Sequence, residues 1–278
     1  FSVVAVAEMC VTAVLGFDYV GQISVPKFFS GTEDMEEAVK SLDDGTFYRS
    51  ELADAKMVDE NAWYDLNAVG LFGSTATDGM VRMMDSLGFY TGANEYLYQG
   101  ATPVTNLLLD VRYIYYHPED ELYTDFVYKD TFGDFDVYEN PTEGMSIGYM
   151  INNDIDQWFY ESAYPFRVQN EFCAFGYGIY DIFDGLDIPD PAVTGCTAER
   201  TNDGEYYFEY EESSEDNMVF SVPVEKDMDD LYIFYDGTQV ENAEISVNGT
   251  VVRQRDIDGY MLPIRQVEEG SVLPVKFE

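Results

Sequence analysis

The sequence predicts an α+β protein, in which a mixed α/β layer domain is followed by an antiparallel β-sandwich of jelly-roll type. Two observations support this prediction. Up to about residue 190, helical and strand-like segments alternate, as in layered domains that combine helices with a sheet. From about residue 196, six short strand-like segments follow one another with turn formers between them, and no segment of helical period intervenes.

The elements of the first domain are predicted from periodicity, caps and turn formers. Thr32 and the acidic residues after it favour a helix start, and Gly88 favours a helix stop. Pro103 suits the first turn of a helix, and Gly133 suits a hairpin turn. In order, we expect an extended segment 20–26, helix 31–42, strand 46–52, strand 61–71, helix 74–87, helix 102–109, strand 111–116, hairpin 126–140, strand 146–152 and a helix within 164–180.

Three regions follow from these patterns: an apolar segment 1–24, a mixed α/β domain 25–190 and a β-sandwich domain 196–278. The proline-containing stretch 184–195 is the predicted linker. Residues 1–17 are almost wholly apolar, so they are either the outer end of a membrane helix or a buried helix of the domain itself. Since the first residue is Phe1, we expect the chain to be a piece of a longer protein.

The charge balance is strongly acidic, with 54 Asp and Glu against 14 Lys and Arg and a formal net charge of −40. Such a surface repels nucleic acid, so a nucleic-acid partner is not expected. The acids either form a solvated surface adapted to salt or supply oxygen ligands for a divalent cation in loops. The acidic loops with candidate ligands contain Asp181, Asp184, Asp187 and Asp190, and Asp227, Asp229 and Asp230.

Cysteine and histidine are scarce, with three cysteines and one histidine. Cys173 and Cys196 would form a disulfide only if the fold places them close together. With His117 as the only histidine, a His-rich zinc site and a Cys/His protease site are not expected. No catalytic residue, metal ligand set or cofactor is predicted in this chain.

Carbohydrate contact is one interpretation of the 23 tyrosines, since aromatic rings stack on sugars while carboxylates accept hydrogen bonds from sugar hydroxyls. The alternative is that strands simply favour tyrosine. Ser74, Thr75 and Asp78 precede or begin a predicted helix. Their polar groups either cap that helix or contact an anion or sugar.

Six short sequence motifs follow one another along the chain: Phe47–Arg49, Phe72–Thr75, Leu87–Gly88, Asp110–Tyr113, Gly148–Met150 and Pro165–Asn170. This ordered series resembles the extracellular region of the YfhO family of bacterial polytopic membrane proteins. The chain departs from the family pattern at Gly73, at Asp110, where the pattern has glycine, and at Arg112, where it has lysine. The candidate ligand-binding residues lie in or beside these motifs: Ser74, Thr75, Asp78, Tyr113, Tyr149, Gln169 and Asn170.

The resemblance implies an accessory part of a membrane glycosyltransferase of the GT-C type, on the extracellular face of the bacterial cytoplasmic membrane. Its implied partners are the transmembrane part of the same polypeptide and a cell-envelope glycan or teichoic acid, with lipoteichoic acid as an acceptor. Because that polymer is anionic, cations or a basic face near Arg253 and Arg255 would be needed to hold it. The alternatives are a secreted or surface-anchored carbohydrate-binding or structural envelope module, and a glycan hydrolase.

Overall fold

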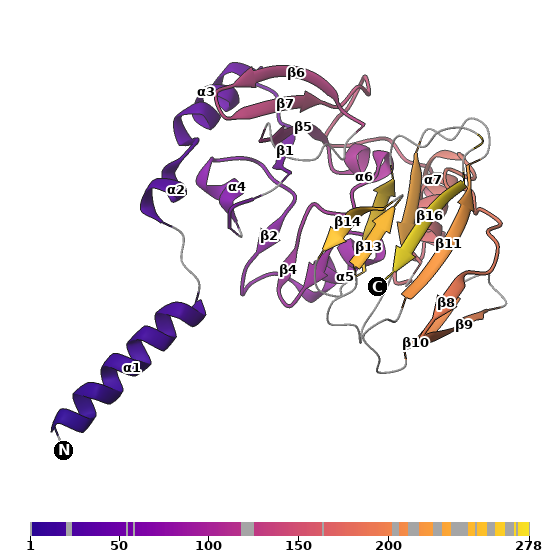
Figure 1. The fold of residues 1–278 in the computed structure, drawn as a ribbon. Coiled ribbons are helices and arrows are strands. Elements are labelled where there is room, and N and C mark those ends of the chain that lie inside the picture. Colours follow the sequence, from indigo (N-terminus) through magenta and orange to yellow (C-terminus); the bar gives the residue numbers. More distant parts are fainter. Residues whose placement is uncertain are drawn as a thin grey trace.

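The protein has the predicted α+β fold in a computed structural model (Figure 1). The structure describes residues 2–20, 24–53, 55–57, 59–117, 125–162, 164–201, 206–210, 217–224, 230–234, 244–247, 249–254, 259–264, 270 and 272–277. The helices are α1 (Ser2–Val20), α2 (Val25–Phe29), α3 (Thr32–Leu42), α4 (Glu60–Trp63), α5 (Asp78–Ser86), α6 (Pro103–Leu108), the 3₁₀ helix η1 (Asn153–Gln157) and α7 (Pro165–Tyr177).

The strands fall into an N-terminal and a C-terminal group. The first group contains β1 (Arg49–Leu52), β2 (Leu71–Phe72), β3 (Thr91–Gly92), β4 (Glu95–Tyr96), β5 (Val111–Tyr116), β6 (Val127–Phe132) and β7 (Phe135–Glu139). The second contains β8 (Ala192–Thr194), β9 (Cys196–Arg200), β10 (Tyr206–Tyr210), β11 (Asn217–Pro223), β12 (Leu231–Phe234), β13 (Glu244–Val247), β14 (Thr250–Gln254), β15 (Met261–Ile264) and β16 (Val272–Phe277).

The main sheet of the α/β part has the order β1-β5-β7-β6, with β1 parallel to β5 and the other pairs antiparallel. Because successive strand residues point to opposite faces, β5 supplies two hydrophobic cores. Tyr113 and Tyr115 pack with Met35 of α3, whereas Ile114 and Tyr116 belong to the cluster that contains residues of α5 and α7. Buried side chains therefore cover both faces of the sheet.

The C-terminal part is built from antiparallel strands, as predicted. One sheet has the order β14-β13-β16-β11-β8, and β9–β10 and β12–β15 form separate pairs. Its core is a single cluster with Met218, Ile245 and Val275 almost fully buried. Gly249 has a φ of 80° in the connection between the paired strands β13 and β14. The sandwich arrangement remains a prediction.

Several local predictions are confirmed with small changes of boundary. Strand β5 covers the predicted 111–116, and β6 and β7 form the predicted hairpin around Gly133. Helix α6 begins as expected, because the Thr102 hydroxyl accepts a hydrogen bond from the Thr105 N–H and Pro103 occupies the first turn. The predicted helix within 164–180 is α7, which ends at Gly178 with a φ of 69°.

The predicted strand at 61–71 is wrong. Its first half is the short helix α4, and the chain then reverses through Asp65, whose φ is 56°. Tyr64 turns into the core beside Phe135, so the aromatic content of this segment reflects packing and not a strand. Only Leu71 belongs to a strand, the two-residue β2.

The predicted strand at 146–152 is also wrong, because this segment bonds to the end of α7 and not to a neighbouring strand. The Asn152 N–H donates to the Gly176 carbonyl at 2.8 Å, and the Ser146 N–H donates to the Tyr149 hydroxyl at 2.9 Å. The expected extended segment 20–26 is wrong at both ends, because α1 includes Val20 and α2 begins at Val25. Helix α3 is capped by Gly31, and Thr32 donates instead to the Phe29 carbonyl.

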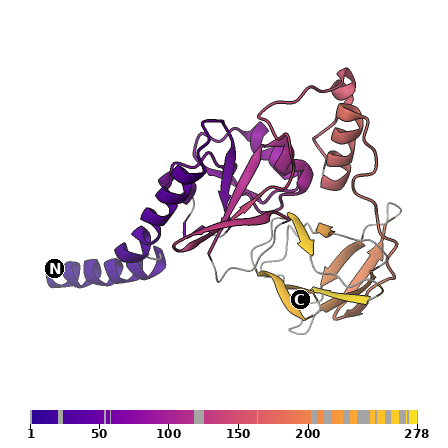
Figure 2. The ribbon, with the colours of Figure 1, turned by 90° about the horizontal axis from the view of Figure 1, so that it is seen from above.

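Helix α1 projects away from the rest of the chain (Figures 1 and 2). The described side chains of residues 4–16 are all exposed, so the alternative of a buried domain helix is wrong. Within the described part of the chain, no helix meets the length and apolarity needed to cross a membrane.

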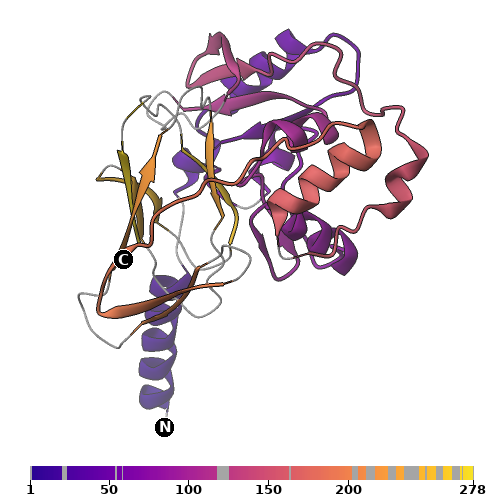
Figure 3. The ribbon, with the colours of Figure 1, turned by 90° about the vertical axis from the view of Figure 1, so that its right-hand side faces the viewer.

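The C-terminal strands lie beside the α/β part (Figures 1 and 3). Hydrogen bonds of the buried Met261 join the two parts. The Met261 N–H donates to the Gly88 carbonyl at 2.8 Å. Gln169 donates to the Met261 sulfur at 3.2 Å and to the Leu87 carbonyl at 2.7 Å. Its amide oxygen accepts from the Thr102 hydroxyl at 2.6 Å. A fully satisfied buried amide thus connects α6, α7 and β15.

Asp110 combines two unfavourable features, so Asp110→Gly should raise the free energy of unfolding by about 1–2 kcal/mol. Its φ is 55°, it has no exposed surface, and neither carboxylate oxygen has a hydrogen-bond partner among the described residues. Glycine would remove both the backbone strain and the unpaired buried carboxylate. Urea denaturation measures the change. Asp65→Gly, at a φ of 56° on the surface, is the control for the backbone term alone, and an equal gain there would contradict the role of burial.

Candidate functional site

A polar pocket of about 490 Å³ lies at the edge of the main sheet, beside the turn after α3. This volume is within the range of small-molecule sites in proteins. Its walls come from the end of α3 and the following turn, from β5, β6 and β7, and from the loop after β7. The lining residues are Ser41, Leu42, Asp44, Arg112, Tyr113, Lys129, Glu139, Asn140, Thr142, Gly144 and Met145.

Strand pairing brings the charged side chains of the pocket together. Tyr113 of β5 pairs with Glu139 of β7, and Glu139 pairs with Val127 of β6. An irregularity in β6 between Tyr128 and Asp130 contains Lys129. Lys129 donates to Glu139 at 2.7 Å, and its ammonium lies 5.3 Å from the centre of the Tyr113 ring.

Arg112 forms the second cationic group of the pocket. Its Nη1 donates to Asp44 at 3.0 Å and to the Thr46 hydroxyl at 3.2 Å. The guanidinium lies 4.7 Å from the Tyr48 ring centre, and the Tyr48 and Tyr113 rings meet edge to face at 5.2 Å. The turn that holds Asp44 is closed by its own hydrogen bonds, because Asp43 accepts from the Gly45 N–H.

The charges of the pocket balance. The hydrogen bonds from the hydroxyl and backbone N–H of Thr46, followed by the charge of Arg112, lower the pKa of Asp44. The hydrogen bond to Glu139 raises the pKa of Lys129, so its cationic form is favoured. Burial, followed by the charge of Glu139, raises the pKa of Tyr113, so its hydroxyl keeps its proton at neutral pH. Two cations thus face two carboxylates in a chain with a net charge of −40.

Asn140 and Thr142 complete one wall. The Asn140 side chain donates to the Val111 carbonyl at 3.2 Å, and its amide oxygen accepts from the Thr142 N–H at 3.0 Å. The loop after β7 is therefore tied to the sheet. The arrangement offers donors, acceptors and an aromatic edge within one concave surface, which are the groups that bind hydroxylated ligands such as sugars.

The structure brings only one of the predicted ligand-binding residues, Tyr113, into this pocket. Ser74 and Thr75 lie exposed in a turn, and Asp78 begins α5 and forms an ion pair with Arg82 at 2.7 Å. The N-cap of α5 is Thr77, whose side chain makes no capping hydrogen bond, so capping by Ser74 or Thr75 is not observed.

The other three candidates lie at or within α7. Tyr149 is partly exposed in the loop bonded to the end of this helix. Gln169 is fully buried in the contacts around Met261. Asn170 exchanges two hydrogen bonds with the backbone of Phe183, at 2.8 and 2.9 Å. The ligand-binding role of these residues remains a prediction.

The acidic loops are only partly described. Asp187 pairs with Arg200 at 3.3 Å, and Asp190 accepts from the Tyr206 hydroxyl at 2.8 Å. Asp227 and Asp229 lie outside the described residues. Among the residues that are described, no group of three or more His, Cys, Asp or Glu side chains is placed to hold a metal ion. A divalent cation in these loops remains a prediction.

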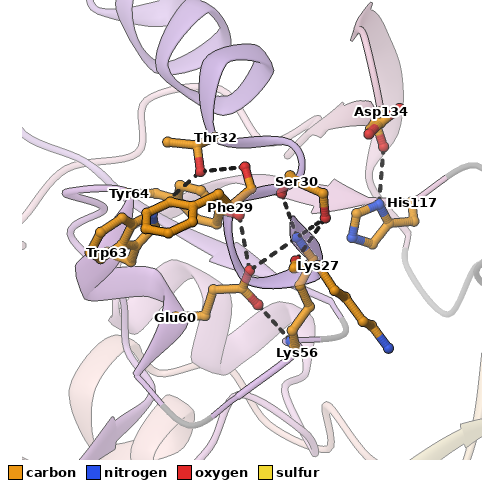
Figure 4. A network of polar contacts seen from close by, with 10 residues as sticks. All are labelled: Lys27, Phe29, Ser30, Thr32, Lys56, Glu60, Trp63, Tyr64, His117 and Asp134. Atoms are coloured by element: carbon orange, nitrogen blue, oxygen red, sulfur yellow. Dashed lines mark hydrogen bonds and ion pairs between the residues drawn. The ribbon is translucent and has the colours of Figure 1, made fainter. Parts of the chain in front are cut away.

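The single histidine and the cysteines are placed away from the pocket. The His117 Nδ1 lies 3.1 Å from the Asp134 carbonyl, and its ring packs at 4.7 Å from that of Phe135 (Figure 4). Cys173 and Cys196 are both buried, and they form no disulfide with each other. Burial raises the pKa of Cys173, which keeps its thiol protonated.

Sequence reasoning misses the charged residues of the pocket. Lys129 and Glu139 lie within the predicted hairpin, and Arg112 stands out in the sequence only as a departure from the family pattern. A usable signal is the scarcity of cations: the chain has only 14 Lys and Arg residues, and Arg112 and Lys129 each stand next to a tyrosine in strands of one sheet. The expected basic face cannot be located, because the Arg253 side chain and Arg255 are not among the described residues.

Comparison with known proteins places the whole chain in one family. The family described as "Bacterial membrane protein YfhO" matches residues 1–277. No curated protein and no solved structure matches the chain significantly. The family match includes α1, the α/β part with its pocket and the C-terminal strands, so it confirms the resemblance to this family and supports association with a membrane. The chain therefore belongs to the YfhO family of bacterial membrane proteins.

Proposed function

We propose that this chain is the extracellular, non-catalytic portion of a YfhO-type membrane glycosyltransferase, and that its pocket holds a segment of the cell-envelope polymer on which the enzyme acts. Family membership supports the relation to a membrane glycosyltransferase. Lipoteichoic acid is the proposed polymer. In this proposal, the chain positions the acceptor while the transmembrane part of the same polypeptide performs the transfer.

The observation that carries the proposal is the charge balance of the pocket. Elsewhere the acidic surface would repel an anionic polymer, but here Arg112 and Lys129 neutralise the local carboxylates. A sugar hydroxyl can donate to Asp44 or Glu139 and accept from Arg112 or Lys129, and the Tyr113 ring provides an apolar edge. The balance of local charge therefore permits binding of a neutral glycan segment.

Binding of defined glycans to the purified chain tests the role of the pocket. Arg112→Gln and Glu139→Gln should each weaken the affinity for a bound mono- or disaccharide by about tenfold or more, because each removes a charged hydrogen-bond partner. Arg82→Gln is the matched control, since Arg82 also forms an ion pair but lies on α5 outside the pocket. Isothermal titration calorimetry measures the affinities. Equal weakening by all three substitutions would contradict the assignment of the pocket.

Cysteine labelling tests the extracellular location separately. Within residues 1–278, a Cys10→Ser, Glu143→Cys variant leaves one exposed thiol, because Cys173 and Cys196 are buried, and the Cys10→Ser variant alone gives the background labelling. A membrane-impermeant maleimide should label this thiol in intact bacteria that produce the full-length protein. Labelling only after the cells are lysed would refute the extracellular location. Glycan binding by a protein that is released from the membrane would instead support a secreted envelope module.

A further inference from the structure

An exposed cluster of aromatic side chains lies next to the point where α1 leaves the body of the protein. We call Phe28, Phe29 and Trp63 the aromatic platform, and Val25 lies on the same short helix α2 as the two phenylalanines. The rings of Phe28 and Phe29 lie 5.0 Å apart, and both meet Trp63 edge to face at 5.1 and 5.5 Å. Val25, Phe29 and Trp63 are 69%, 51% and 45% exposed. Contiguous exposed aromatic surface of this kind marks an interaction site.

A polar frame holds the aromatic platform in place (Figure 4). The Thr32 hydroxyl donates to the Phe29 carbonyl at 3.0 Å and accepts from the Trp63 indole N–H at 3.4 Å. Lys56 donates to the Ser30 carbonyl at 2.6 Å, which ties the end of α2 to the segment before α4. Hydrogen bonds therefore hold both segments that carry the rings, the end of α2 and the helix α4.

Glu60 completes this frame below the platform. Its carboxylate accepts from the Tyr64 hydroxyl at 2.9 Å and from the Lys56 N–H, and it lies 3.7 Å from the Lys56 ammonium. The two side chains of this ion pair are only 12% and 3% exposed. The buried polar groups beneath the rings are therefore hydrogen-bonded, as in a well-packed region. The exposure of the aromatic platform is thus not a sign of loose local packing.

The segment that carries Phe28 and Phe29 differs in charge from the rest of the chain. Residues 19–32 contain no Asp or Glu and one base, Lys27, although the whole chain has 54 acids. Lys27 is exposed and forms no ion pair with a described carboxylate. A segment with aromatic rings, one lysine and no acid has the composition that occurs where proteins meet the headgroup region of a bilayer.

Helix α1 directly precedes that segment in the chain. It is apolar and exposed along its described side chains, and it leaves the body beside α2 (Figure 1). We propose that the aromatic platform rests in the headgroup region of a phospholipid bilayer and orients the body of the protein on the membrane. This proposal rests on the family's membrane association and is independent of glycan binding by the pocket.

A bilayer suits this surface better than a second copy of the chain. Each copy carries a net charge of −40, so association of two copies brings strongly repelling surfaces together. A zwitterionic headgroup region has no such net repulsion, and it accommodates tryptophan and phenylalanine rings with a lysine at the water boundary. The frame beneath the rings would then keep their orientation fixed relative to α3 and α4.

Tryptophan fluorescence tests the proposal, because the chain has two tryptophans with different surroundings. Trp63 is exposed in the aromatic platform, whereas Trp158 packs against Phe172 and donates to the Val168 carbonyl. The Trp158→Phe and Trp63→Phe variants of the whole chain each leave one reporter. In phosphatidylcholine vesicles with lipids brominated close to the headgroup, we expect strong quenching of Trp63 and little quenching of Trp158. Equal quenching of both reporters, or of neither, would overturn the proposal.

Substitutions in the aromatic platform provide the second readout. Phe28→Ser with Phe29→Ser should lower the vesicle partition coefficient by about tenfold, and Lys27→Glu should lower it further in vesicles that contain anionic lipid. Tyr207→Ser, at an exposed aromatic of β10, is the matched control and should leave partition unchanged. Circular dichroism confirms folding of each variant. Unchanged partition of the double variant would overturn the proposal. A lipid-free shift of Trp63 emission that depends on protein concentration would indicate a second copy and would also overturn it.

Discussion

Replacing Gly100 with alanine should lower the free energy of unfolding by about 4 kcal/mol. Gly100 is buried and has a φ of 97°, and a Cβ atom there would lie 2.0 Å from the Gly88 carbonyl oxygen. The atom that it would strike is backbone, so no side-chain rotation can relieve the contact. That same oxygen accepts the hydrogen bond from the Met261 N–H. Alanine would therefore displace the backbone on which β15 is docked.

Urea denaturation measures the loss of stability, and Gly144→Ala provides the matched control. Gly144 also has a positive φ, of 77°, but a Cβ atom added there would meet nothing within 4 Å. The control should cost only about 1 kcal/mol, which is the backbone contribution alone. Amide hydrogen exchange at Met261 gives a local readout, since its protection should fall in the Gly100 variant and persist in the control. Equal losses in the two variants would show that the close contact with Gly88 does not matter.

The elements that the sequence predicts well are those specified by local signals. Helix α6 begins where Pro103 predicts its first turn, and the structure adds the cap by the Thr102 hydroxyl. Strand β5 is a run of β-branched and aromatic residues, and Gly133 marks the hairpin that follows. In each case the residues that decide the structure lie within a few positions of one another.

The segments that the sequence predicts badly depend on partners far along the chain. The aromatic content of residues 61–71 predicts a strand, but these residues wrap around the buried carboxylate of Glu51. Residues 146–152 bond to the end of α7 instead of forming a strand. The pocket shows the same limit, because Arg112 reaches Asp44 from 68 positions away, a contact that periodicity does not reveal.

Glu51 is the site of the second large expected effect, because it is a carboxylate with only 1% of its surface exposed. It accepts hydrogen bonds from the Val69 N–H, from the Gly70 N–H at 2.9 Å and from the Asn61 side chain at 2.9 Å. Burial raises its pKa from 4.5 to about 7, opposed by these donors and by the charge of Arg49. The neutral form is therefore favoured in the folded protein over a range in which an unfolded chain is ionised.

The sign of the pH effect follows from that difference. Below pH 4.5 the carboxyl is protonated in both states, so its burial has no ionisation cost. As the pH rises from 4.5 to about 7, the unfolded state loses its proton first, and the folded state becomes less stable. Above pH 7 the whole cost, about 3 kcal/mol, is present.

Glu51→Gln should remove this dependence, because glutamine keeps an oxygen to accept the Val69 and Gly70 N–H groups but cannot ionise. Relative to the parent protein, the variant should gain about 2 kcal/mol in free energy of unfolding between pH 5 and pH 7.5. Urea denaturation of both proteins at the two pH values measures this change, since titration of the other acids is common to both. Glu143→Gln, at an exposed loop position, is the control for the loss of one carboxylate. If the difference in free energy of unfolding between Glu51→Gln and the parent is the same at both pH values, the three hydrogen-bond donors outweigh burial and keep Glu51 ionised across this range.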